Sequence, residues 1–183
     1  SFFAALRDRA GRRPDAGARV RMLEKTPKNA LRVPFLARVF PEARFIYLHR
    51  DPRLVLASMM EAWGSGRFRT YPNLPGWSGL PWSLLLVPGW RDLVDRPLHE
   101  IVAAQWNTTT RLLLDDLEQL PSGSWTVANY EALVANPDAE IRRLCTANFL
   151  AWDTLLPQML PLSSYTVSTP DPETASPQTT RSS

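Results

Sequence analysis

The sequence predicts an α/β fold in which a parallel sheet is flanked by helices. Two observations carry this prediction. Short apolar segments of strand length alternate with longer segments of helical period, and the turns between them hold residues that cap helices. The chain has 183 residues, of which 44% are hydrophobic, so it is long enough for one domain with a sizeable core.

In the first third of the chain, strand and helix patterns alternate at the lengths of parallel βα units. Asn29 is placed to cap the second helix of this series. The expected elements are a helix end at 1–13, a strand at 19–24, a helix at 30–39, a strand at 44–49 and a helix from 52 to about 63.

The remainder is expected to hold a loop, two helices and one strand. Residues 64–90 contain five of the eight glycines and four prolines, which favours an irregular segment that extends to about residue 97. A helix is expected at 98–120, a strand at 125–129 and a helix from Asp138 to about 150. We therefore expect one partial domain over 1–156 and a disordered Ser/Thr/Pro-rich tail over 157–183.

The charge of the chain is divided unevenly. Residues 1–69 carry 15 Lys and Arg against 6 Asp and Glu, a net charge of +9, whereas residues 70–183 carry a net charge of −6. A basic half of this size suits an anionic ligand, and it is equally typical of an ordinary solvated face. Nucleic acid is not the expected partner, because the sequence has neither zinc-finger spacing nor an aromatic RNA-binding signature.

Several classes of protein are disfavoured. No apolar run reaches the length of a membrane span, and the first residues do not have the pattern of a secretory signal. The single cysteine, Cys145, excludes an intrachain disulfide and is expected to be a core thiol. No metal-ligand spacing occurs, so no metal is expected. These features indicate a reducing, cytoplasmic location.

The segment 44–63, RFIYLHRDPRLVLASMMEAW, is the first candidate site. An apolar strand ends at Arg50, followed by Asp51 as a helix cap and by a proline suited to the first helical position. In a parallel sheet this strand end faces the ligand crevice, where Arg50 and the hydroxyl of Ser58 can converge on one phosphate. The alternative is a generic turn with a surface arginine and a helical serine.

EKTPKN, residues 24–29, is the second candidate. Lys25 would point into the same crevice if the strand that precedes it is a neighbour of 44–49. A lysine there can neutralise the charge that develops on a bridging oxygen during group transfer. The alternative is a solvated lysine at the end of a strand.

Together these segments resemble the nucleotide-dependent sulfotransferases, especially the bacterial and glycan-type branch. EKTPKN, FPEARFIYLHRDPRLVLASMMEAW and NYEALVANPDAEIRRL follow one another in the family's order and spacing over residues 22–150. The resemblance implies the P-loop-like sulfotransferase fold. It also implies 3′-phosphoadenosine 5′-phosphosulfate as donor, adenosine 3′,5′-bisphosphate as product, and a small-molecule or glycan acceptor.

The resemblance also implies a role for four residues. Arg50 and Ser58 match the pair that binds the donor's 3′-phosphate, and Lys25 matches the lysine that assists transfer of the sulfonate. Tyr130 matches the tyrosine that lines the adenine end of the site, although a half-buried aromatic beside a strand end explains it as well.

Three departures from the family pattern bear on activity. Residues 1–21 contain no Gly/Ser/Thr-rich loop for the 5′-phosphosulfate, so we expect the domain to be truncated at its N-terminus. Pro27 stands where many members have a histidine base, and the tail offers only Arg181 toward the 3′-phosphate. The general base is left unassigned, because none of the candidates His49, Glu24 and His99 is favoured for that role.

The sequence therefore leaves two functions open. One is a sulfotransferase, and the alternative is a catalytically incomplete descendant that binds a nucleotide or a partner. The Trp-rich loop is either a lid over the acceptor or simple packing. Trp106 is expected in the core, and Asp115-Asp116 on a solvated helix face.

Overall fold

A computed structural model describes residues 22–150 of the chain. It divides into two compact units, which we name by their contents. The tryptophan unit comprises residues 22–43 and 51–124, and the sheet unit comprises residues 44–50 and 125–150. Each unit is described by itself.

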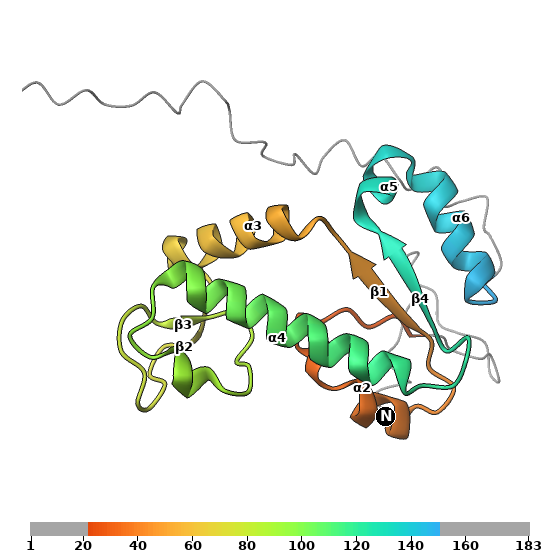
Figure 1. Cartoon of the computed structure of the whole chain (residues 1–183). Coiled ribbons are helices and arrows are strands. Elements are labelled where there is room, and N and C mark those ends of the chain that lie inside the picture. Colours follow the sequence, from red (N-terminus) through yellow and green to blue (C-terminus); the bar gives the residue numbers. More distant parts are fainter. Residues whose placement is uncertain (1–21, 151–183) are drawn as a thin grey trace, which may run out of the picture. The chain divides into compact units, whose positions relative to one another are not determined.

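The tryptophan unit is mainly helical. Its two long helices, α3 and α4, pack against each other, and the short strands β2 and β3 form an antiparallel pair beside them (Figure 1). Its elements are η1 (Pro27–Leu31), α2 (Val33–Val39), α3 (Pro52–Ser65), β2 (Arg69–Tyr71), β3 (Trp82–Ser83), η2 (Trp90–Leu93) and α4 (Leu98–Glu118).

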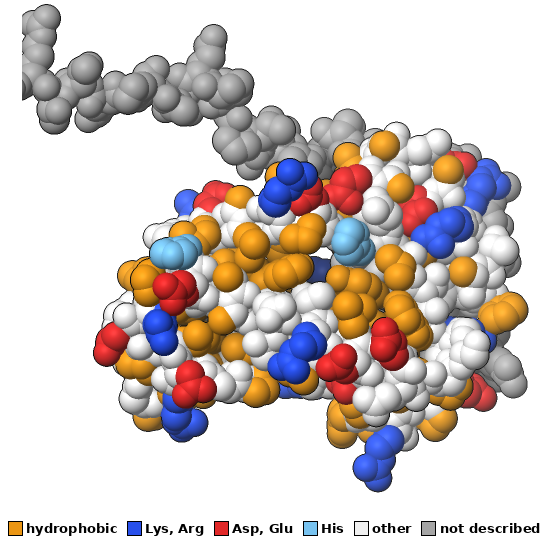
Figure 2. Space-filling view, in the orientation of Figure 1, with side chains coloured by type: hydrophobic (Ala, Val, Ile, Leu, Met, Phe, Trp, Pro, Cys, Tyr) orange, Lys and Arg blue, Asp and Glu red, His pale blue; other side chains and the backbone are white. Residues whose placement is uncertain are grey.

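Indole rings form the core of this unit. Trp82 is fully buried and lies edge-on to Trp63 and Trp77, with ring centroids 5.3 and 4.7 Å apart. Gln105 of α4 is also buried, and it accepts a hydrogen bond from the Trp63 indole N–H at 3.2 Å. Hydrophobic side chains gather where α3 and α4 lie side by side (Figure 2). The predicted loop 64–97 is thus a packed part of the core, with Trp90 also buried.

The sheet unit contains β1 (Phe45–His49), β4 (Trp125–Asn129), α5 (Tyr130–Ala135) and α6 (Pro137–Ala147). The two strands are parallel neighbours, in a register that pairs Phe45 with Trp125 and His49 with Asn129 (Figure 1). Both strands therefore end at the same edge of the sheet, and α6 packs against β4.

Side chains at the helix ends explain where the helices begin and end. Asp51 caps α3 by accepting a hydrogen bond from the Arg53 backbone N–H at 2.8 Å, and the helix ends at Gly66, whose φ of 64° favours glycine. Asn129 and Asn136 cap α5 and α6 by the same use of the side-chain oxygen.

These observations confirm the predicted α/β class with a parallel sheet flanked by helices. The strands at 45–49 and 125–129, the helix after Asp51 and the helix 98–118 occur where they were expected. The buried Cys145 agrees with the prediction of a core thiol.

Three local predictions were wrong. Residues 22–24 are not a strand, so Lys25 does not follow one among the described residues. The predicted helix 30–39 is divided at Arg32 into a 3-10 turn and an α-helix, because Pro34 has no N–H to continue one ladder and fits only the first turn of a new helix. The cap of the last helix is Asn136 rather than Asp138, which instead pairs with Arg142 at 2.8 Å.

The predicted helix end at 1–13 and the predicted tail at 157–183 lie outside the described residues, and the domain boundaries stay predictions. Within residues 22–150, no helix combines the length and the apolar character that crossing a bilayer requires. The same residues contain no group of three His, Cys, Asp or Glu side chains arranged to hold a metal ion.

Candidate functional site

The parallel register of the sheet unit brings two of the predicted site residues together. His49 is opposite Asn129, so the residues that follow the two strands, Arg50 and Tyr130, lie side by side at the carboxyl edge of the sheet. The guanidinium carbon of Arg50 lies 4.6 Å from the centroid of the Tyr130 ring. This is a cation–π contact, and it restrains the position of the guanidinium.

The Arg50 guanidinium keeps an unused donor. Its Nε is buried and makes no hydrogen bond with any described residue. A buried charged donor without a partner is costly for the folded protein, because the group has lost its water and gained nothing in return. Such a donor at the open edge of a parallel sheet is suited to an anionic ligand.

A carboxylate and an arginine on α6 hold the end of β4. Glu140 is 7% exposed and accepts a hydrogen bond from the Asn129 backbone N–H at 3.0 Å. Arg143 donates to both Glu140 oxygens and to the carbonyl of Val127. The Arg143 hydrogen bonds, and then that of the Asn129 N–H, lower the pKa of Glu140 to about 2. We call these four residues the β4 clamp.

The clamp has a direct consequence for Tyr130. Asn129 is held through its backbone by Glu140, while its side chain accepts the Ala132 N–H at 2.8 Å and starts α5. Tyr130 is the first residue of that helix. The direction in which its ring leaves the strand is therefore set from both sides of Asn129.

Asp51 and Arg53 shape the turn that starts α3. The Asp51 carboxylate also accepts a hydrogen bond from the Arg53 side chain, with Nη2 and Oδ2 2.7 Å apart. This side-chain bond and then the backbone bond lower the pKa of Asp51 to about 2. Asp51 consequently acts as a charged helix cap.

Ser58 and Lys25 are accessible in the tryptophan unit. Ser58 lies on α3 with its side chain exposed, and Lys25 lies in the coil before η1. Neither side chain forms a hydrogen bond or an ion pair with the residues that the structure describes. Whether Ser58 joins Arg50 at one phosphate, and whether Lys25 faces the same site, stay predictions.

The segment EKTPKN forms its own hydrogen-bonded turn. The Thr26 hydroxyl donates to the Glu24 carboxylate, which also accepts from the Asn29 side chain at 3.3 Å. The Lys28 ammonium lies 5.7 Å from the centroid of the Tyr71 ring in β2. This turn is thereby attached to the segment that leads into the tryptophan core.

The two histidines occupy different surroundings. His49 is half-buried and lies edge-on to Tyr47, with ring centroids 6.2 Å apart, which agrees with a packed residue. His99 is exposed in the first turn of α4. Among residues 22–150, neither imidazole forms a side-chain hydrogen bond or an ion pair that would prepare it to act as a base.

Sequence reasoning missed the β4 clamp and the Lys28–Tyr71 contact. Glu140 and Arg143 stand three residues apart, a spacing that also describes an ordinary ion pair on a helix surface. A further signal lay in four residues that favour the start of a helix. Asn129 with Glu131, and Asn136 with Pro137, indicate two short helices after the strand.

Comparison with known proteins gives one family. Its model, described as "Sulfotransferase family", matches residues 2–154. A Caenorhabditis briggsae protein named "Putative protein-tyrosine sulfotransferase" is 28% identical over 130 residues, which are 71% of this chain and 36% of that protein. The chain therefore spans about a third of the length of this curated relative.

Among solved structures, the sulfotransferase domain from the curacin biosynthetic pathway aligns with 73% of this chain and 40% of its own. The TM-score is 0.49 and the sequence identity is 19%.

Proposed function

Because the chain belongs to the sulfotransferase family, we propose that it serves the transfer of a sulfonate group from 3′-phosphoadenosine 5′-phosphosulfate to a hydroxyl or amine acceptor. The observation that carries this proposal is the Arg50 guanidinium, which lies over the Tyr130 ring and whose buried Nε has no hydrogen-bond partner within residues 22–150.

Arg50 is suited to a terminal phosphate for two reasons. Its planar fork of donors matches two phosphate oxygens, and the contact with the Tyr130 ring restrains the guanidinium before a ligand arrives. The proposed ligand group is the 3′-phosphate of the donor, with the Ser58 hydroxyl as a second donor of a hydrogen bond. The Tyr130 ring then lines the adenine end.

The proposed chemistry is a displacement at sulfur. The acceptor oxygen or nitrogen forms a bond to sulfur while the bond between sulfur and the leaving phosphate oxygen breaks. Lys25 is the proposed group that neutralises the charge on that oxygen, and its exposed ammonium has no competing carboxylate among the described residues. The acceptor's proton passes to a base that we do not assign.

The test of the proposal is a titration with adenosine 3′,5′-bisphosphate. Replacing Arg50 with alanine is expected to weaken binding about thirtyfold, which corresponds to about 2 kcal/mol for a charge-assisted hydrogen bond. Arg53→Ala is a matched control, because this arginine lies three residues away and its side chain is 89% exposed. Adenosine 5′-monophosphate, which lacks the 3′-phosphate, should bind the parent and Arg50→Ala equally.

Two results would change the proposal. Equal affinity of the parent and Arg50→Ala for the bisphosphate would remove the nucleotide assignment. Binding that depends on Arg50, with no transfer by the longest natural form of the protein, would favour the catalytically incomplete descendant.

A further inference from the structure

A cavity of about 420 Å³ lies entirely within the tryptophan unit. Its apolar walls come from three segments: the end of η1, the middle of α4 and the chain before η2. They are formed by Leu31, Leu86, Val87, Pro88, Trp90 and Leu112, and one charged residue, Asp116, completes the lining.

Asp116 is the polar feature of this cavity. It follows Leu112 by four residues on α4, so both side chains lie on the same face of the helix. Asp116 is half-buried, and within residues 22–150 its carboxylate has neither an ion pair nor a hydrogen bond. The prediction of a solvated pair at 115 and 116 stays a prediction for Asp116, which is less exposed than its neighbour.

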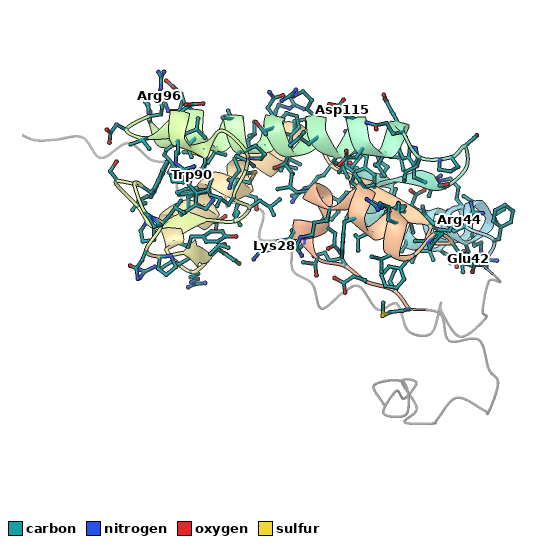
Figure 3. The ribbon with its side chains drawn as sticks, turned by 90° about the horizontal axis from the view of Figure 1, so that it is seen from below. Lys28, Glu42, Arg44, Trp90, Arg96 and Asp115 are labelled. Atoms are coloured by element: carbon teal, nitrogen blue, oxygen red, sulfur yellow. The ribbon has the colours of Figure 1, made fainter. Side chains whose placement is uncertain are left out.

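Asp115 behaves as that prediction expected. It is exposed, and it projects from the side of α4 opposite to the side on which Trp90 and Lys28 lie (Figure 3). The chain thus offers two adjacent carboxylates of which only one lines the cavity.

We propose that this cavity binds an organic cation with an apolar body about the size of one aromatic ring, and that this cation is the acceptor. The size and the apolar walls are typical of small-molecule sites, in which few polar groups fix the orientation of the ligand. The unpaired carboxylate selects the charge, because it attracts a cation and repels an anion.

Arg91 limits where the positive charge of the ligand can lie. Its guanidinium carbon is 4.5 Å from the Trp90 ring centroid, so that ring face already carries a cation. The ammonium group of a ligand is consequently assigned to Asp116, and its apolar body to the leucine and proline walls.

The assignment of the cation as acceptor rests on the proposed function. Leu31, the last residue of η1, contributes to the cavity wall, and Lys25 precedes the first residue of η1 by two positions. The five residues of η1 span about 10 Å at the 3-10 rise of about 2 Å per residue. A ligand in the cavity thus contacts η1, the short helix that begins two residues after Lys25.

Three probes of the same shape test the cavity directly. They are 2-phenylethylamine, 2-phenylethanol and 3-phenylpropionate, which carry a positive, no and a negative charge. Binding is followed by NMR through the indole N–H of Trp90, identified by its loss in Trp90→Phe. The expected order of affinity is amine, then alcohol, then acid.

Variants of the two carboxylates give the decisive comparison. Asp116→Asn is expected to lower the affinity for the amine about twofold to fivefold and to leave the alcohol unchanged. Asp115→Asn should change neither. Leu112→Trp, which fills the cavity, should abolish binding of all three probes while the helical circular dichroism is retained.

The inference is overturned if the amine binds no better than the alcohol, or if Asp115→Asn and Asp116→Asn have the same effect. Neither measurement uses the nucleotide. Loss of bisphosphate binding with intact amine binding would therefore reject the proposed function alone, and the reverse result would reject the cavity alone. An increase in KM for an acceptor that carries a hydroxyl group besides its ammonium in Asp116→Asn, with unchanged affinity for the donor, would support the acceptor role, with the hydroxyl as the group that attacks sulfur.

Discussion

The tryptophan unit and the sheet unit are stabilised in different ways. Eight of the ten buried hydrophobic residues that the structure describes belong to the tryptophan unit, and the sheet unit contributes only Ala128 and Cys145. Each unit buries two polar residues, Ser83 and Gln105 in the tryptophan unit and Glu140 and Asn148 in the sheet unit, so polar groups form a much larger share of what the sheet unit buries. Apolar burial is non-directional, whereas hydrogen bonds specify orientation.

Exposure of the strands accentuates this difference. Ile46, Leu48 and Val127 are 40–48% exposed, so much of the apolar surface of the two-stranded sheet does not contribute to a core. Such a pair of strands has little stability by itself. The β4 clamp therefore carries a large share of the order in the unit that presents Arg50 and Tyr130.

The largest expected effect is in the tryptophan core. Trp82→Ala removes a fully buried indole and should lower the free energy of unfolding by about 3–5 kcal/mol, a large part of the stability of a domain. Urea unfolding followed by circular dichroism measures this change. Trp82→Phe keeps an aromatic ring and should lose less. A loss below about 1 kcal/mol in Trp82→Ala would contradict the central role of the indole cluster.

A polar residue inside that same core tests whether the contrast is complete. Gln105 donates to the carbonyls of Ser83 and Leu85 and accepts from the Trp63 indole. Gln105→Leu removes these three hydrogen bonds, although the Leu85 carbonyl keeps the one from the Trp82 indole N–H, and we expect a loss of about 2–3 kcal/mol in urea unfolding. The nearby Thr109→Val should cost less than about 1 kcal/mol. Equal losses would show that the hydrogen bonds of Gln105 add nothing to packing.

Acid should weaken the sheet unit through Glu140. The pKa of about 2 in the folded protein lies below the ordinary value of about 4.3, so folding favours the carboxylate. The stabilisation is complete above the ordinary pKa and is lost as pH falls toward 2. Hydrogen exchange at the Asn129 amide between pH 6 and pH 2 should show this loss in the parent, and a smaller change in Glu140→Gln.

The pKa of Asp51 is similarly lowered, but Asp51 is present both in the parent and in Glu140→Gln. A difference in acid dependence between these two proteins is therefore due to Glu140. Glu118→Gln, an exposed position on α4, serves as the control for loss of one negative charge. A parent and a Glu140→Gln variant with the same acid dependence would mean that the clamp does not depend on charge.

The smallest expected effect concerns a helix cap in the sheet unit. Asn136 accepts the Ala139 N–H at 3.2 Å at the start of α6. Asn136→Ala should lower the free energy of unfolding by about 1 kcal/mol, while Asn136→Asp, which keeps an acceptor, should be nearly neutral. Urea unfolding of both variants provides the measurement. An equal loss in the aspartate variant would assign the effect to something other than the cap.

The sequence was informative where local signals agreed with tertiary structure. The strand that ends at Arg50 and the helix that Asp51 starts could be predicted, because the apolar pattern, the capping residue and the proline all indicate the same boundary. Prediction of a strand end next to Tyr130 relied on the same logic. The stacking of Arg50 on Tyr130 then follows from the register of two strands separated by about eighty residues.

Long-range packing explains what the sequence did not reveal. The chain from 64 to 97 lacks a regular period because its tryptophans pack against α3 and α4 rather than along one element. Asp116 resembles its neighbour Asp115 in sequence, and only the folded chain places Leu31 and Pro88 around it. Of the expected strand at 19–24 the structure describes only residues 22–24, which are coil, and an alternating pattern becomes β-structure only with a partner strand.

The buried thiol of α6 allows the rate at which the sheet unit opens to be measured. Cys145 is the only cysteine in the chain and is 8% exposed. A thiol reagent can modify it quickly only after α6 has opened, so the labelling rate measures how often the sheet unit unfolds locally. The labelling rate of Cys145 therefore reports the opening of the unit that presents Arg50, and a nucleotide bound to that unit should lower this rate.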